Sequence, residues 1–369
     1  MISIMRTFIL LLITLLAAPV FADTDLGAYV DKMFNAVPAS APGAAILVIR
    51  DGKVVFERGY GTTDLRTQNK IDEHTNFRLA SVSKQFTATA VMLLVHDGKL
   101  SYDRTLTQIF PEFPAYGKAI TIRQLLTHTS GLQDYEELMA VQYKSIPDDQ
   151  IPQISDAGVL ALMEKASTTK FQAGSKWAYS NSGYCVLAMV VERISGQPFA
   201  DFLAARIFKP LHMDDTIAYM KGKNEVKNRA YGHTGEAGVF HETDQSSTSA
   251  TLGDGGIYTS LADLAKWDDA LTHHTLLSEK EMRPALIAVA PAGGSENGEP
   301  VSYGFGWFVN PYKAHERMWH YGETIGFRTC IQRFPKDHLT VVVLCNRSDM
   351  SAIQSALEIS ELYLGIETY

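Results

Sequence analysis

Apolar residues form short runs near both ends of the chain and recur at helical spacing through its middle. Residues 26–37 have helical periodicity, and residues 43–61 form two β-rich runs around Asp51-Gly52, a pair typical of hairpin turns. Four more strands and a closing helix are predicted near the C-terminus, at 303–309, 316–321, 326–334, 339–346 and 351–365.

Helical patterns dominate from Ser81 to about residue 272. The C-terminal strands are too closely spaced for helical crossovers, so the sheet is expected to be antiparallel. The predicted class is α+β: an antiparallel sheet flanked by the N- and C-terminal helices, with an inserted, mostly helical domain. The helices expected there span residues 81–97, 121–129, 154–166, 182–195 and 260–271.

This pattern suggests two subdomains with a site between them. The sheet subdomain is expected at about 23–80 plus 290–369, and the helical subdomain at about 81–289. Two polar, glycine-containing stretches, roughly 221–250 and 291–300, are predicted to be long loops.

The first 22 residues have the pattern of a secretory signal peptide. Arg6 precedes an apolar run from Phe8 to Leu16, and small residues end the segment at Ala22. Pro19 and the acidic residues beyond it interrupt the run before the roughly 20 apolar residues that a membrane span needs. We expect a mature chain of residues 23–369, periplasmic or secreted, with no stable membrane anchor after cleavage.

Composition indicates a large core and argues against one class of partner. With 369 residues, 46% of them hydrophobic, the chain has enough apolar residues for a large core. Its formal net charge of −8 comes without a block of basic residues, which argues against nucleic acid as a partner. Oligomeric state is left open.

Cysteine and histidine spacing predicts neither a metal site nor a bound cofactor. The three cysteines have no disulfide-framework or zinc spacing, and buried free thiols are favoured. Cys330 and Cys345 flank a predicted turn at 335–338, and a bridge between them is the less favoured alternative. Four histidines, His233, His241, His273 and His274, also lack metal-ligand spacing.

Ser81 and Lys84 lie three residues apart at the start of an unusually apolar helical segment. Side chains at i and i+3 share a helix face, so these two are expected to touch. Burial lowers the pKa of a lysine, and a neutral amine is able to take the serine proton. The alternative is a helix-capping serine beside a solvated lysine.

Two other short motifs complete a catalytic pattern. Tyr179 and Asn181 stand two apart before a predicted helix, and His320 and Gly322 share one face of a predicted strand. Taken singly, each is also compatible with a structural role. His128 is expected to make a structural hydrogen bond at a helix end.

In this order the three motifs resemble the serine β-lactamase and penicillin-binding-protein superfamily, with its Ser-x-x-Lys, Tyr-x-Asn and His-x-Gly elements. The chain is most similar to the class C β-lactamase-like serine hydrolases, which include carboxypeptidase, D-aminopeptidase and esterase relatives. Segments such as "LLTHTSGLQDY" and "GDGGIYTSLADLAKWDDAL" extend the resemblance across the mature chain.

The resemblance implies a role for each residue. Ser81 is the nucleophile, Lys84 its proton acceptor or a modulator of it, and Tyr179 the general base or proton shuttle, with a depressed pKa. The set implied for binding the substrate and its oxyanion is Asn181, His320, Gly322 and Glu323, with the N–H groups of Ser81 and Glu323 as oxyanion donors.

His320 departs from the pattern of dedicated β-lactamases, which usually carry lysine there. A histidine with an ordinary pKa of about 6.5 is largely neutral at pH 7, so recognition of a substrate carboxylate is expected to be weaker unless Arg328 substitutes.

The resemblance therefore favours a serine hydrolase working through an acyl-enzyme. The expected substrates are D-amino acid or peptidoglycan-type peptides or β-lactams, that is, small molecules or peptides. Two alternatives stay open: an esterase acting on small esters, and a receptor that binds penicillin or muropeptides without hydrolysing them.

Overall fold

The computed structural model describes residues 23–366 except 237, 288–289 and 297. The predicted signal peptide, residues 1–22, lies outside the described residues, as does the extreme C-terminus from residue 367.

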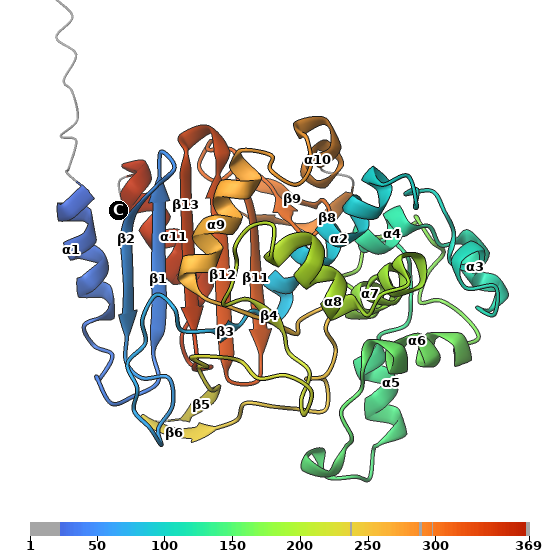
Figure 1. The fold of residues 1–369 in the computed structure, drawn as a ribbon, viewed down its shortest axis with the longest axis horizontal. Coiled ribbons are helices and arrows are strands. Elements are labelled where there is room, and N and C mark those ends of the chain that lie inside the picture. The colour runs from blue at the N-terminus through green and yellow to red at the C-terminus, as the bar shows by residue number, and fades with distance from the viewer. Residues whose placement is uncertain (1–22, 237, 288–289, 297, 367–369) are drawn as a thin grey trace, which may run out of the picture.

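An eight-stranded antiparallel sheet forms the centre of the molecule (Figure 1). Its strand order is β2-β1-β13-β12-β11-β10-β9-β8, so strands from the two ends of the chain meet where β1 pairs with β13. The predicted α+β class and the single sheet built from both chain ends are confirmed. The strands are β1 (Ala44–Arg50), β2 (Lys53–Tyr60), β8 (Ala290–Glu296), β9 (Glu299–Tyr303), β10 (Phe308–Val309), β11 (Met318–Thr324), β12 (Phe327–Phe334) and β13 (Leu339–Cys345).

The turn between β1 and β2 has the predicted geometry. Asp51 and Gly52 both adopt positive φ, at 51° and 72°, and Arg50 pairs with Lys53 across them. Two successive left-handed residues give a hairpin turn whose twist matches that of the strands.

Helices cover both faces of the sheet. On one face, the terminal helices α1 (Asp23–Phe34) and α11 (Ala352–Leu364) bury Val30, Phe34 and Ile359 against the strands (Figure 1). On the other face, α9 (Leu261–Thr272) packs against β1. The other helices make up the helical region. That region contains α2 (Lys84–His96), α3 (Leu106–Ile109), α4 (Ile122–Leu126), α5 (Tyr135–Gln142), α6 (Asp156–Lys165), α7 (Asn181–Ser195), α8 (Phe199–Leu203) and α10 (Glu279–Leu286).

Two smaller sheets lie among the helices and loops. One has the order β3-β7-β4 and the other is the hairpin β5-β6. Their strands are β3 (Phe77–Arg78), β4 (Ile217–Ala218), β5 (His233–Glu236), β6 (Val239–Glu242) and β7 (Ile257–Thr259). The expected limits of the two subdomains, at residues 80/81 and 289/290, stay a prediction.

Of the two predicted long loops, the first is wrong only in part and the second is wrong. Within 221–250 the strands β5 and β6 take up residues 233–236 and 239–242, whereas 291–296 and 299–300 belong to β8 and β9 at the edge of the main sheet. Pairing with a neighbouring strand supplies hydrogen bonds that the polar sequence itself does not signal.

The predicted strand 303–309 is interrupted. β9 ends at Tyr303, and Gly306 turns at a φ of 78° before β10 begins. A Cβ on Gly306 would lie 2.9 Å from the carbonyl oxygen of Lys84, so the turn passes directly over the start of α2. The contact with α2 therefore explains why the predicted strand is interrupted.

The cysteines are buried free thiols, as favoured from the sequence. Across β12 and β13, Cys330 faces Val343 and Cys345 faces Arg328, so the two thiols are not register partners. Within the described part of the chain, no helix combines the length and apolar character needed to cross a membrane.

Candidate active site

Ser81 lies in a short 3₁₀ turn, Ala80–Ser83, here called the nucleophile turn, which leads directly into α2. Ser81 is partly exposed, whereas its neighbours Ala80 and Val82 are buried. Ala80 adopts a φ of 47°, a left-handed conformation that is uncommon for a residue with a side chain. Such local strain is often found at functional sites, and here it immediately precedes the predicted nucleophile.

Lys84 is fully buried and directed at Ser81. Its Nζ lies 2.9 Å from three acceptors: Ser81 Oγ, Asn181 Oδ1 and the carbonyl oxygen of Asp254. The predicted contact between Ser81 and Lys84 is therefore present, and Asn181 joins it from α7.

Burial lowers the pKa of Lys84 to about 8, although Asp254 acts in the opposite direction. With this pKa, about one-tenth of the amines are neutral at pH 7. A neutral amine 2.9 Å from a hydroxyl is placed to accept its proton, so the desolvation of Lys84 supplies the base that a serine nucleophile needs.

Tyr179 packs its ring under Lys84, whose Nζ lies 4.9 Å from the ring centroid. Its hydroxyl is buried and makes no hydrogen bond of ordinary geometry to another described residue, although Ser81 lies near enough to affect its pKa. The expected depression of its pKa is wrong: burial raises the pKa of Tyr179 well above 10, and the nearby Ser81 hydroxyl offsets this only in part. The phenol is neutral in the free site, so Lys84 is the better base there.

His128 positions the segment that carries Tyr179 and Asn181. Its Nδ1 accepts the backbone N–H of Ser180 at 3.1 Å, and its carbonyl accepts the N–H of Ala178. Ser180 in turn caps α7 by accepting the N–H of Gly183. The structural hydrogen bond predicted for His128 at a helix end is present.

His320 is buried and uncharged. Its Nδ1 lies 2.7 Å from the carbonyl oxygen of Tyr321, which requires a proton on Nδ1, and its Nε2 then accepts from the Tyr303 hydroxyl at 2.9 Å. Burial, with Lys84 nearby, lowers the pKa of His320 to about 3. The residue therefore supplies no positive charge at any ordinary pH.

Gly322 lets β11 lie against the nucleophile turn. A Cβ at this position would be 2.2 Å from the Leu79 carbonyl oxygen and 3.0 Å from the Ser81 backbone nitrogen. His320 and Gly322 are both buried on one face of β11, as predicted, whereas the Glu323 side chain is 57% exposed. This arrangement brings the backbone of β11 at Gly322 beside Ser81, and the expected oxyanion donor, the N–H of Glu323, belongs to the next residue of the same strand.

The structure adds groups that the motifs do not include. The Asp254 carbonyl binds Lys84, and the exposed carboxylate of Glu136 accepts from Asn181 Nδ2 at 3.2 Å. Glycines mark the turn after Asp254 in the sequence, but nothing there identifies the carbonyl as a lysine ligand. Glu136 lies in an ordinary acidic first turn of α5, which carries no signal of a site.

A hollow of about 400 Å³ opens beside the end of β11, and Glu323, Gly326 and Arg328 are among its lining residues. Arg328 does not project a free charge into it. Its Nη1 donates to the carbonyls of Thr324 and Phe327 at 2.8 and 2.7 Å, and its Nε lies 3.9 Å from Glu323. Arg328, the cation expected to replace the missing lysine in binding a substrate carboxylate, is therefore already bound to other groups of the protein.

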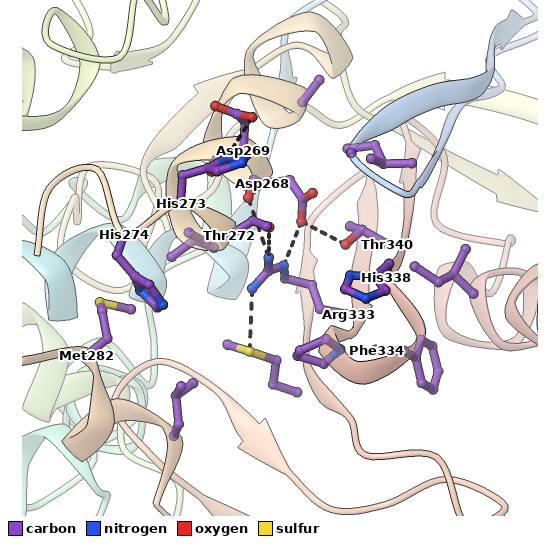
Figure 2. Close-up of a pocket in the computed structure, with 18 of the residues that line it drawn as sticks. Asp268, Asp269, Thr272, His273, His274, Met282, Arg333, Phe334, His338 and Thr340 are labelled. Atoms are coloured by element: carbon purple, nitrogen blue, oxygen red, sulfur yellow. Dashed lines mark hydrogen bonds and ion pairs between the residues drawn. The ribbon is translucent and has the colours of Figure 1, made fainter. Parts of the chain in front are cut away.

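A second cavity, of about 330 Å³, lies between α9, α10 and the opposite end of the sheet (Figure 2). Figure 2 shows Arg333 in this cavity, hydrogen-bonded to Asp268 and Thr272, with His273 paired to Asp269. The polar groups are largely satisfied by one another, and none forms a nucleophile–base pair. The hydrolytic chemistry therefore belongs to the site at Ser81.

The model of the Beta-lactamase family matches residues 30–362. The chain belongs to the Beta-lactamase family. Its members related to this chain are serine hydrolases, and the Ser81–Lys84–Tyr179–Asn181 cluster is the feature of the structure that fits such chemistry.

Individual members of the Beta-lactamase family are similar over most of the chain. Penicillin-binding protein 4* of Bacillus subtilis (strain 168) is 29% identical over 324 residues, 85% of this chain and 70% of that protein. A D-aminopeptidase of Cereibacter sphaeroides (strain ATCC 17023) is 30% identical over 353 residues, 93% of this chain but only 64% of that protein. The solved penicillin binding protein of Bacillus halodurans superposes with a TM-score of 0.74 at 25% identity, covering 91% of this chain and 98% of its own.

Proposed function

We propose that the protein hydrolyses amide bonds that follow an amino acid with a free amino group, in the manner of a D-aminopeptidase, and that it does so in the periplasm or outside the cell. The observation that carries this proposal is the charge around the nucleophile. Two carboxylates, Glu136 and Glu323, border the site and outweigh the partly protonated Lys84, whereas His320 is neutral and Arg328 is bound to backbone carbonyls. Burial raises the pKa of Glu136, and its hydrogen bond from Asn181 and the nearby Lys84 act in the opposite direction. An ammonium group is favoured at such a site, and a C-terminal carboxylate is not.

The chemistry proceeds through an ester of Ser81. The Lys84 amine takes the hydroxyl proton as Ser81 Oγ attacks the substrate carbonyl carbon, and the backbone N–H groups of Ser81 and Glu323 stabilise the oxyanion. When the C–N bond breaks, the proton returns to the leaving amine, with Tyr179 in reach to relay it. Water then attacks the acyl-enzyme and gives its proton to Lys84, and Ser81 regains a proton as the C–O bond breaks.

Asn181 links this chemistry to the substrate. Its Oδ1 accepts from Lys84 and its Nδ2 donates to Glu136, so the amide joins the base to the carboxylate proposed to bind the substrate amine. Relatives described as D-aminopeptidases support the choice of a D-amino acid, and the neutral His320 argues against a dedicated β-lactamase.

The test compares four substrates on the purified chain: D-alanyl p-nitroanilide, its N-acetylated form, an N-acylated D-alanyl-D-alanine and p-nitrophenyl acetate. We expect the free-amine anilide to have the highest kcat/KM of the three amides, and Ser81→Ala to abolish its turnover. Faster turnover of the N-acylated dipeptide, turnover of the ester alone, or a persistent adduct with fluorescent penicillin without turnover would each contradict the proposal.

Glu136→Gln tests amine recognition specifically. An exposed ion pair contributes up to about 1 kcal/mol, so the KM for the free-amine anilide should rise about fivefold, with the N-acetylated substrate unaffected. The matched control is Glu137→Gln, which removes the neighbouring carboxylate that pairs instead with Lys170 at 2.8 Å. An equal effect of both variants would refute a specific role for Glu136.

A further inference from the structure

The backbone carbonyl of Asp254 belongs to a loop that several elements hold in place. This segment, residues 252–257, is here called the Lys84-binding loop. Thr87 donates to the Gly253 carbonyl at 2.6 Å, Arg78 to the Gly255 carbonyl at 3.2 Å, and Ser83 accepts the Ile257 N–H at 3.2 Å. These three contacts come from residues close to the nucleophile turn.

On the side of the helical region, the loop is held by one carboxylate. Asp156, the first residue of α6, is only 6% exposed. Its Oδ2 accepts the Leu252 N–H at 2.8 Å and its Oδ1 accepts the Gly253 N–H at 3.0 Å. The carboxylate thus binds the two residues that immediately precede Asp254.

We propose that Asp156 is a positioning residue for the proton acceptor: its ionised carboxylate holds the Lys84-binding loop so that the Asp254 carbonyl fixes the Lys84 amine against Ser81. Both oxygens are needed for this, because each accepts a different backbone N–H. A protonated carboxyl retains one full acceptor oxygen, which weakens one of the two bonds and loosens the loop.

The surroundings of Asp156 make this device sensitive to pH near neutrality. Burial and the nearby Asp254 raise the pKa of Asp156 to about 7, while the two N–H donors and the Cys185 thiol lower it. Other titratable groups also lie around Asp254 and the site. They are Lys84 of α2, Tyr135 and Glu136 of α5, Cys185 of α7, His320 and Tyr321 of β11, and His128 and Tyr179. Acidification below pH 7 therefore removes the charge on Asp156 as well as protonating Lys84.

The inference rests on acylation of Ser81, which the proposed function shares, but not on which amide is cleaved. The test accordingly measures the second-order rate of Ser81 labelling by a fluorophosphonate from pH 5 to 9, with folding checked by circular dichroism. Labelling without turnover of the D-alanyl anilide would count against the proposed function alone.

For the wild type we expect the logarithm of the labelling rate to rise with a slope of about 2 below pH 7, where two groups must lose protons, and of about 1 between pH 7 and 8. Asp156→Asn should label about 10- to 100-fold more slowly at pH 8, and its slope should stay near 1 below pH 7, without the steeper part of the wild-type profile. The matched control is Asp64→Asn, which alters another buried carboxylate that accepts two backbone N–H groups, from Arg66 and Thr67. This control should keep both slopes.

A wild-type slope of 1 down to pH 5, or wild-type labelling by Asp156→Asn, would overturn the proposal. If Asp156→Asn does not fold, the test uses Thr87→Val and the wild-type pH profile instead. Thr87→Val removes the hydrogen bond to the Gly253 carbonyl, so it loosens the same loop while the Asp156 carboxylate stays in place. Slower labelling by Thr87→Val, with the slope of about 2 below pH 7 retained, supports the proposal. An unchanged labelling rate overturns it.

Discussion

Lys84, Tyr179 and His320 lie together at the site, and burial affects each of them differently. Loss of hydration disfavours the charged form of every titratable group, so it lowers the pKa of Lys84 to about 8 and that of His320 to about 3, and it raises that of Tyr179. Of these three residues, Lys84 is the one that changes charge near neutral pH. It sets the dependence of acylation on pH between 7 and 9, and the proposed effect of Asp156 adds to it at lower pH.

Activity should rise with pH through about 8. Because the reactive form of Lys84 is the neutral amine, its titration alone should increase kcat/KM about fivefold between pH 7 and 8, and the increase should level off above pH 8. A stopped-assay profile of the wild type measures this, and a plateau already reached at pH 7 would contradict the assignment.

Lys84→Met removes the proton acceptor and keeps an unbranched side chain. It should lower kcat by about 10²–10⁴ and abolish the rise in activity with pH near pH 8. Lys99→Met, a change at an exposed lysine just beyond the end of α2, should leave both the rate and the profile unchanged. The same steady-state assay compares the two variants.

The three cysteine thiols give an independent check on packing. Burial raises the pKa of both Cys330 and Cys345 to about 12, so a native sample should react with a thiol reagent only after unfolding. Mass spectrometry should then find three labels without prior reduction. Fewer than three labels in unfolded, unreduced protein would indicate a disulfide.

At the scale of secondary-structure elements, the site depends on how closely β11 approaches the nucleophile turn. Thr329 of β12 reinforces this contact by donating to the Leu79 carbonyl at 2.7 Å. Backbone N–H groups stabilise an oxyanion only within hydrogen-bonding distance, so small shifts of the strand are costly.

Gly322→Ala should displace β11 from Ser81, because the added Cβ would lie 2.2 Å from a carbonyl oxygen. We expect a loss of about 10²–10³ in kcat, similar to the removal of one oxyanion donor. Gly294→Ala, in β8 of the same sheet, meets nothing within 4 Å and should be neutral. Wild-type kcat for Gly322→Ala would exclude β11 from oxyanion binding.

At the scale of the whole molecule, Asn346 joins segments that lie far apart in the sequence. Its Oδ1 accepts the Gly43 N–H at 2.7 Å, and its Nδ2 lies within 3.1 Å of the carbonyls of Thr62, Thr63 and Tyr231. The residue follows β13 directly and is fully buried, so it ties the end of that strand to the N-terminal segment and to the loop before β5.

Asn346→Leu should reduce the free energy of unfolding by about 3 kcal/mol, because it removes the acceptor of the buried Gly43 N–H and the donor shared by three carbonyls. Since Asn346 makes no contact with Ser81 or Lys84, activity per folded molecule should be retained at low temperature. Urea denaturation with parallel activity assays measures both quantities, and a loss of activity in fully folded protein would show coupling to the site.

Much of the fold was predictable because it depends on local patterns. Asp51-Gly52 gives a hairpin, the apolar run from Lys84 to His96 gives a buried helix, and closely spaced strands give an antiparallel sheet. The break after Tyr303 and the edge strands β8 and β9 were not predictable, because they depend on contacts with α2 and with neighbouring strands.

The sequence by itself was enough to predict the family, through the order of its three motifs. The same resemblance gave the predicted site residues Ser81, Lys84, Tyr179, Asn181 and the strand from His320 to Glu323, and helix spacing explained why Ser81 and Lys84 should touch. Only the tertiary structure decided their charges: the amine is partly neutral, the phenol is neutral and the imidazole is uncharged, because burial and long-range hydrogen bonds set pKa values. It alone assigned Glu136, Asp156 and the Asp254 carbonyl their contacts, although the glycines after Asp254 already predicted a tight loop near the cleft.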